Sequence, residues 1–231
     1  MLSICVMSDL HGVLPSIEPC DMLLICGDIS PLRIQKNIPQ CEEWLKITFA
    51  NWVNSLPCDQ VIFVAGNHDK VFENRNYEWV NSVITKPTDN KAIYLENSHV
   101  DYLSTDGKVY RIWGTPCCHI FGNWSFMYPD EILRRCYSTM PYDCDIVISH
   151  DAFSINNYGV VPPNIWHDKP INAGNEVLTK MILEHKPTYA FCGHIHEGNH
   201  NLSNIEGIKM ANVSLVNDNY ELAYLPLYID I

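Results

Sequence analysis

Residues 61–69, VIFVAGNHD, decide the fold class. The first five residues form the continuous apolar run of a strand that is covered on both faces, and the tetrapeptide GNHD follows without a spacer. Gly66 suits a tight turn at the strand end, and Asn67, His68 and Asp69 bring polar side chains to that turn. The stretch therefore predicts a strand of a layered α/β sheet that ends at a group of potential ligands.

The rest of the chain repeats this arrangement of a strand followed by a polar turn. Short apolar runs predict further strands at residues 2–7, 22–26, 109–113, 146–148, 189–192, 208–213 and 222–229. Helical spacing of apolar residues predicts helices at residues 42–56, 130–137 and 176–184. The polar residues 156–175 are expected to form a long surface loop and a candidate wall of a substrate cleft. No linker interrupts the 231 residues, which favours a single domain over residues 1–231.

Charge and composition restrict the function. A formal net charge of −12 argues against binding to duplex nucleic acid, because that affinity depends on lysine and arginine at the phosphates. Any phosphate chemistry would therefore have to obtain its positive charge from metal ions. The chain has neither a run of 18 apolar residues nor the features of a secretory leader, so we expect a cytoplasmic protein without a membrane partner.

The ten cysteines are predicted to be free thiols. Disulfide frameworks are typical of short secreted chains, and no CxxC pair suggests a metal knuckle. For the adjacent Cys117 and Cys118 the favoured interpretation is two loop thiols, with metal binding or a response to oxidants as the alternative.

Five short polar clusters lie at or near the ends of predicted strands. They are Asp9-Leu10-His11, Gly27-Asp28, Gly66-Asn67-His68-Asp69, Ser149-His150 and Gly193-His194-Ile195-His196. Each alone is compatible with an ordinary turn, but the carboxyl ends of sheet strands meet at one rim, where the five could converge. Their carboxylates, imidazoles and amide are donors that bind Mn²⁺, Fe²⁺ or Zn²⁺. The joint pattern therefore predicts a metal site.

In this order the clusters match D-x-H, G-D, G-N-H-D, [GST]-H and G-H-x-H, and the chain resembles the calcineurin-like metallophosphoesterase superfamily from Asp9 to His196. The resemblance implies a four-layer αββα sandwich of two mixed sheets flanked by helices. It implies two divalent metal ions, with manganese preferred and iron, zinc, nickel or magnesium as alternatives. One ion would be held by Asp9, His11, Asp28 and His196, and the other by Asp28, Asn67, His150 and His194.

The resemblance also implies catalytic roles beside the metals. His68 matches the histidine that faces the leaving group, where it would act as general acid, and Asp69 matches the acid that orients it. A looser likeness to the metallophosphoesterase-domain (MPPED-like) branch rests on residues 113–116, WGTP, and residues 121–124, FGNW. That branch implies cyclic-nucleotide or other phosphodiester substrates. After His150 this chain has Asp-Ala-Phe where relatives often have Gly and Pro.

These features favour a phosphoesterase that uses a hydroxide bridging two metals, and within that class a phosphodiesterase for nucleotide or cyclic-nucleotide diesters. Two divalent ions, two aspartates and a hydroxide leave a formal charge of about +1, which suits a diester monoanion. The arginines with which protein phosphatases clamp a dianion are replaced by Pro31, Leu32, Lys70 and Phe72, although Arg33 lies one position away. The alternatives are a phosphomonoesterase or protein phosphatase of the same superfamily, and a non-catalytic binding module with this fold.

Side chains outside the clusters receive weaker expectations. His119 and His167 lie in loops that could reach the cleft, and the other histidines outside the motifs are assigned no role. Trp113, Phe121 and Trp124 are predicted to be core residues, with stacking on a nucleobase as the alternative.

Overall fold

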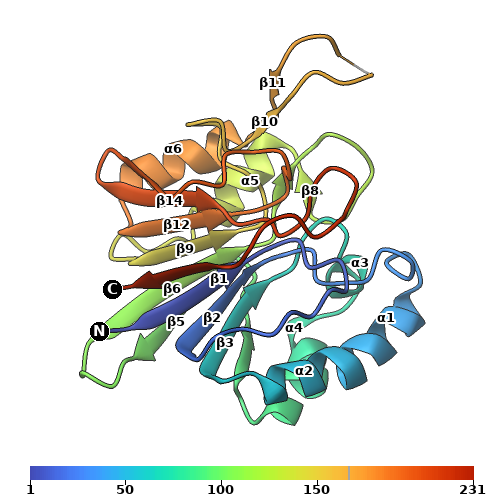
Figure 1. Cartoon of the computed structure of the whole chain (residues 1–231), viewed down its shortest axis with the longest axis vertical. Coiled ribbons are helices and arrows are strands. Elements are labelled where there is room, and N and C mark those ends of the chain that lie inside the picture. The colour runs from blue at the N-terminus through green and yellow to red at the C-terminus, as the bar shows by residue number, and fades with distance from the viewer. Residues whose placement is uncertain (166) are drawn as a thin grey trace.

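The computed structural model describes residues 1–165 and 167–231. Two large mixed sheets lie face to face, with helices on both outer sides (Figure 1). The first sheet has the strand order β15 (Leu227–Asp230), β1 (Ser3–Met7), β2 (Cys20–Cys26), β3 (Cys58–Val64) and β4 (Ala92–Tyr94). Strands β1 to β4 run parallel, and β15 pairs antiparallel with β1.

The second sheet combines four parallel strands with an antiparallel strand at each edge. Its order is β13 (Ser203–Ile205), β14 (Ile208–Asn212), β12 (Tyr189–Cys192), β9 (Ile146–Ser149), β6 (Val109–Thr115) and β5 (Ser98–Leu103). Strands β14, β12, β9 and β6 run parallel, while β13 and β5 are antiparallel to their neighbours. Two short pairs complete the strands: β7 (Cys118–His119) with β8 (Met127–Tyr128), and β10 (Val160–Val161) with β11 (Ile171–Asn172).

The helices cover the outer faces of the two sheets. A helical stretch against the first sheet consists of α1 (Ile38–Trp44), the π-helical segment η1 (Leu45–Phe49) and α2 (Ala50–Ser55). It is followed after β3 by α3 (Lys70–Glu73), α4 (Tyr77–Val80), the π-helical η2 (Asn81–Thr85) and the 3₁₀ turn η3 (Lys86–Thr88). Helices α5 (Asp130–Tyr137) and α6 (Glu176–His185) cover the second sheet (Figure 1).

Three apolar layers hold this arrangement together. Ile4, Leu24 and Ile62 of the first sheet meet Ile148 and Phe191 of the second in the layer between the sheets. The other two layers lie between each sheet and its helices. Burying apolar surface on both faces of each sheet explains why the parallel strands lack polar alternation. The expected four-layer αββα sandwich of two mixed sheets is confirmed.

The predicted elements agree with the structure to different extents. The helix predicted at residues 130–137 has these bounds in the structure, but the strand predicted at residues 222–229 begins only at Leu227. The helix expected from residue 42 begins at Ile38, because the Asn37 side chain accepts from the Gln40 amide and Pro39 fits the first turn. The helical residues 70–73 and 77–88 and the strands β4, β5 and β13 were not predicted.

Within the part of the chain that the structure describes, no helix is both long enough and apolar enough to cross a membrane. All ten cysteines are free thiols. Cys117 and Cys118 are buried, and no thiol contributes to the potential metal-binding groups found among the described residues. The expected long loop at residues 156–175 contains β10 and β11, and Val161 and Ala173 within it line a cavity described below.

Candidate metal centre

Five parallel strands deliver the polar clusters to one rim of the sandwich. Asp9, Asp28 and Asn67 follow β1, β2 and β3 of the first sheet, and His150 and His194 follow β9 and β12 of the second. The two sheets thus contribute to the same site from opposite sides. Because residues just beyond the carboxyl ends of parallel strands share an edge, clusters far apart in the sequence become neighbours.

The backbone at this rim is strained. Asp9, His11, Asp28 and His194 have positive φ angles of 56°, 44°, 53° and 70°. Residues with a β-carbon rarely occupy the left-handed region, and such strain is concentrated at functional sites. These conformations turn the side chains of the four residues toward a common centre.

Two glycines allow the clusters to approach closely. A β-carbon at Gly66 would overlap the Asp28 carboxylate and lie 2.5 Å from the Asp28 amide nitrogen. A β-carbon at Gly193 would overlap the side chains of Ser8 and Asp9. The glycines in the third and fifth motifs are therefore required by space rather than by left-handed φ angles.

Asp28 lies at the middle of the cluster. Its Oδ1 accepts the His68 amide at 2.8 Å and lies 3.4 Å from Nε2 of His150, while its Oδ2 is 3.7 Å from Nε2 of His11 and 3.9 Å from Nε2 of His68. The carboxylate is 1% exposed. Each of its two oxygens therefore faces a different set of imidazole nitrogens, as a residue shared by two metals would require.

Asp9 forms a second centre beside Asp28. Its Oδ1 lies 3.3 Å from Nε2 of His196 and 4.0 Å from Nε2 of His11, and its carboxylate accepts the His194 amide. Donor atoms of Asp9, His11 and His196 lie within 4.8 Å of one another, as do those of Asp9, Asp28 and His150. Five of the expected ligands, Asp9, His11, Asp28, His150 and His196, thus share one buried cluster.

Two histidines are held from behind by backbone carbonyls. Nδ1 of His150 lies 2.9 Å from the Cys26 oxygen, and Nδ1 of His196 lies 3.0 Å from the Asn217 oxygen. A carbonyl can only accept, so both Nδ1 atoms donate and both Nε2 atoms face into the cluster. Metal-ligating histidines are commonly oriented in this way.

The pKa values of these groups depend on the balance between burial and neighbouring charge. Although burial raises it, the hydrogen bond from His196 and the charges of His196 and His150 hold the pKa of Asp9 well below its usual range. Burial lowers the pKa of His196, but Asp9 outweighs it and the value is about 9. Burial lowers the pKa of His11 to about 4 and, together with the charge of His150, that of His194 to about 4.

The hydrogen bonding of His11 and His150 tests whether these residues fit a cation. Both ring nitrogens of His11 are buried without a hydrogen-bonding partner among the described residues. Nε2 of His150 faces the Asn67 Oδ1 at 2.8 Å, so two acceptors meet unless that nitrogen carries a proton. A cation would satisfy the one lone pair of the neutral His11 ring and the facing lone pairs of His150 and Asn67, and the donor set of carboxylate, imidazole and amide oxygen fits a divalent metal.

His194 is less closely integrated than the other expected ligands. Its ring centroid lies 5.0 Å from that of His150, and the ring lines the cavity beside the cluster. It does not belong to any of the compact donor groups found among the described residues. His68, expected to be a non-ligand, does belong to one, with His11 and Asp28.

The contacts of His68 correct one detail of the sequence analysis. Nδ1 of His68 contacts the Oε1 atom of Gln35, a residue that no motif indicated. Asp69 instead accepts the backbone amides of Ile29, Ser30 and Gly66 at 3.0, 2.7 and 2.9 Å, and no hydrogen bond joins it to His68 within the described chain. Asp69 therefore shapes the loops beneath the site, and Gln35 orients the ring.

A cavity of about 360 Å³ opens beside the cluster. It is lined by Asn67, His68 and His194, and by the rings of Phe121, Trp124 and Tyr220. The prediction of a core position holds for the fully buried Trp113 but is wrong for Phe121 and Trp124, which are 49% and 37% exposed. Both rings belong to the loop between β7 and β8 and line the cavity.

Sequence motifs did not indicate two further parts of this cavity. Tyr220, which is 41% exposed, places its ring 4.9 Å from His11 and 5.2 Å from His196, between centroids. His119 also lines the cavity, and its Nδ1 and amide both contact the buried Asp151 carboxylate, a hydrogen bond that raises the pKa of His119. The Asp that departs from the usual fourth motif thus anchors a cavity histidine. His167 contacts the Lys169 carbonyl instead.

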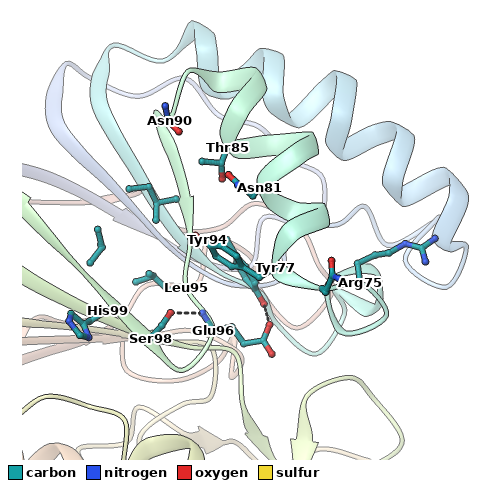
Figure 2. Close-up of a pocket in the computed structure, with 13 residues that line it drawn as sticks. Arg75, Tyr77, Asn81, Thr85, Asn90, Tyr94, Leu95, Glu96, Ser98 and His99 are labelled. Atoms are coloured by element: carbon teal, nitrogen blue, oxygen red, sulfur yellow. Dashed lines mark hydrogen bonds between the residues drawn. The ribbon is translucent and has the colours of Figure 1, made fainter.

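A larger cavity, of about 810 Å³, lies elsewhere and has different chemistry (Figure 2). It is bordered by strands β4 and β5, and its one lining carboxylate, Glu96, accepts a hydrogen bond from the Tyr94 hydroxyl at 2.9 Å. Its one lining arginine, Arg75, pairs with Glu42. No compact group of metal ligands occurs there among the described residues, so volume does not locate the reactive site.

Comparison with known proteins establishes the class. The family model of calcineurin-like phosphoesterases matches residues 2–198, and the chain belongs to that family. The chain is therefore a metallophosphoesterase of the group that uses dinuclear metal sites.

Individual relatives agree with this assignment. Metallophosphoesterase domain-containing protein 1 of Homo sapiens is 26% identical over 253 residues, which cover 99% of this chain and 70% of the relative. Among solved structures, the protein TT1561 of Thermus thermophilus has a TM-score of 0.61 at 12% identity and covers 91% of this chain and 88% of its own. The phosphopantetheinyl hydrolase of Mycobacterium tuberculosis has a TM-score of 0.57 at 14% identity, covering 94% and 90%. These structures support the fold.

Proposed function

We propose that the protein is a phosphodiesterase that hydrolyses nucleotide or cyclic-nucleotide diesters at a pair of divalent cations, with manganese as the preferred metal. The observation that carries the proposal is the buried cluster around Asp28, in which two carboxylates face several inward-turned imidazole nitrogens. Asp9, His11, Asp28 and His196 would hold one cation, and Asp28, Asn67, His150 and His194 the other.

The cations would supply a bound water of lowered pKa and neutralise charge on the phosphoryl oxygens. The protein's own residues position them: Asp28 spans both sites, and the carbonyls of Cys26 and Asn217 fix the orientation of His150 and His196. Burial of the carboxylates excludes water and strengthens these electrostatic interactions.

The diester preference rests on what the cavity lacks. No lysine or arginine lines the described part of the cavity beside the cluster, and Arg33 is exposed outside it. A monoester dianion needs additional cationic donors, whereas a diester monoanion matches the small net positive charge of two cations and two aspartates.

Nucleotide substrates are supported by the aromatic rim of Phe121, Trp124 and Tyr220. All three rings are partly exposed and surround the cluster, with Trp124 4.5 Å from His68 and Phe121 4.9 Å from His194 between ring centroids. Exposed rings at a phosphate site provide faces on which a nucleobase can stack.

His68 is proposed as the general acid. Its Nε2 points toward Asp28, where the reacting ester would lie, and Nδ1 is occupied by Gln35. A proton on Nε2 can therefore pass to the departing oxygen, a transfer that contributes about 10²–10⁴ in rate when the leaving group is poor.

The proposal is tested by turnover of a panel of cyclic nucleotides, dinucleotides and matched monoesters with Mn²⁺ and other divalent metals. We expect diesters to be cleaved with the higher kcat/KM. Monoester cleavage without diester turnover would indicate a phosphomonoesterase. A folded protein that binds no divalent ion after metal reconstitution would indicate a non-catalytic binding module.

A further inference from the structure

A second cavity adjoins the site on the far side of His68. It has a volume of about 440 Å³ and shares two lining residues, His68 and Trp124, with the cavity beside the metal cluster. Gln35, which contacts the back of the His68 ring, also lines it. The proposed general acid thus lies at the boundary between the two spaces, where a leaving group would depart.

The charge of this second cavity differs from that of the first. Lys36 and Lys70 line it, and neither ammonium has an ion pair or hydrogen bond within the described chain. Lys36 lies 5.4 Å from the centre of the Trp124 ring, a cation–π contact that holds it beside the opening. The one lining carboxylate, Glu73, accepts the Phe126 amide at 2.7 Å.

The contrast with the rest of the molecule makes this distribution informative. The protein has a net charge of −12, and the first cavity is lined by Glu197 and Asp218 but by no lysine or arginine in its described part. Two lysines that have neither an ion pair nor a hydrogen bond within the described chain therefore lie beside the proposed general acid, in a protein that is otherwise acidic. Lysine binds phosphate well as a compact point charge.

We propose that this second cavity, the leaving-group cavity, receives a departing alcohol that carries a phosphate of its own, held by Lys36 and Lys70. The inference rests on the proposed phosphodiesterase function and refines its substrate class. In the reaction, the oxygen of water bonds to phosphorus, the bond from phosphorus to the leaving oxygen breaks, and His68 gives that oxygen a proton. The products are one phosphomonoester and one alcohol that still bears its phosphate.

The test uses dinucleotides that differ by one terminal phosphate: ApA as the reference, with pApA and ApAp as the phosphorylated forms. We expect the form whose departing nucleoside bears the phosphate to have a kcat/KM about tenfold above that of ApA, as two partly exposed charge pairs allow. The double variant K36Q/K70Q should reduce this ratio to near one. The control K46Q, an exposed lysine that lines neither cavity, should keep the ratio of the wild type.

A second measurement separates this inference from the proposed function. Analogues of the same dinucleotides in which a methylene group replaces the leaving oxygen keep the monoanionic phosphorus centre but are not cleaved. Bound to the metal-loaded protein, they report the preference without turnover. Tighter binding of the phosphorylated analogue that is lost in K36Q/K70Q supports the leaving-group cavity. If no diester is hydrolysed in that case, only the proposed phosphodiesterase function fails. If diesters are hydrolysed but the ratio is near one in the wild type, or persists in the double variant, the leaving-group cavity is wrong while the phosphodiesterase stands.

Discussion

The contact between Gln35 and His68 provides the sharpest test of the catalytic arrangement. Gln35 is the hydrogen-bonding partner that the structure gives to Nδ1 of His68, whereas Asp69 is engaged by three backbone amides. Replacing Gln35 by alanine should therefore impair proton donation, and Gln35→Glu should favour the protonated ring by placing a carboxylate beside it. Asp69→Asn should affect folding of the loops more than the acid step.

The expected size of the effect follows from what remains around the ring. Trp124 and His11 still confine His68 at centroid distances of 4.5 and 5.1 Å, so alanine at position 35 removes one hydrogen bond and not the whole position. A neutral hydrogen bond contributes about 1 kcal/mol net, or about fivefold. We expect kcat for a diester with a poor leaving group to fall about two- to tenfold, well short of the full general-acid contribution.

The assay compares pH–rate profiles for two diesters, one with an alkyl and one with a nitrophenyl leaving group. Gln35→Ala should slow the alkyl ester and spare the nitrophenyl ester, which needs little protonation, while Gln35→Glu should move the alkaline limb of the alkyl profile to higher pH. Gln40→Ala, an exposed amide on α1, is the matched control. Equal losses on both esters in Gln35→Ala, or the same loss in Gln40→Ala, would refute the positioning role.

Two further predictions concern the metal cluster. Asp28→Asn keeps an oxygen for the His68 amide but removes the charge between the imidazoles, so metal analysis after dialysis should find both ions lost with the fold retained. The control Asp59→Asn, at an exposed position, should keep both ions. Retention of both ions in Asp28→Asn would exclude a shared ligand. The metal-free protein should be most stable near pH 6.5. The pKa values of His11 and His194 are about 4 in the folded protein, below the ordinary histidine value of 6.5, so the free energy of unfolding falls as the pH drops from 6.5 toward 4. The pKa of His196 is about 9, above that value, so the free energy of unfolding also falls as the pH rises from 6.5 through 9. Thermal unfolding in chelator should show the melting temperature falling on both sides of pH 6.5, and His196→Gln should reduce the fall on the alkaline side. A melting temperature that keeps rising between pH 6.5 and 9 would contradict this reasoning.

Local patterns predicted strands covered on both faces and a metal site at the strand ends, whereas the four-layer arrangement was implied by the family resemblance. A strand covered on both faces needs an uninterrupted apolar run, and residues 61–65 or 189–192 show one. Each polar cluster lies directly beyond such a run, so its place at the rim follows from the fold. The prediction of a single domain was not tested by these features and stays a prediction.

The parts that sequence could not predict depend on contacts between distant segments. Gln35 contacts His68 across 33 positions, and Tyr220 packs on His11 from the other end of the chain, without any periodic signal. Edge strand β5 pairs with a neighbour on one side only and alternates half-buried and exposed residues. Its sequence therefore lacks a continuous apolar run and resembles an ordinary loop. Phe121 and Trp124 were assigned to the core because hydrophobicity alone does not distinguish a core ring from one that lines a substrate cavity.

The proposal that this cluster binds metal also explains why residues within it are strained and lack hydrogen-bonding partners. Asp9, His11, Asp28 and His194 adopt left-handed backbone conformations, and neither buried ring nitrogen of His11 has a hydrogen-bonding partner among the described residues, each feature at a cost of order 1–3 kcal/mol. Burial lowers the pKa of His150 and His196, but Asp28 and Asp9 outweigh it, so both pKa values lie above the usual one. Protons on these two histidines therefore interact favourably with the two carboxylates and offset part of this cost. A cation can do what these protons do and also satisfy His11, whose low pKa keeps the ring neutral, with one nitrogen lone pair available to coordinate. Metal binding should therefore stabilise the folded protein and release protons as it does so.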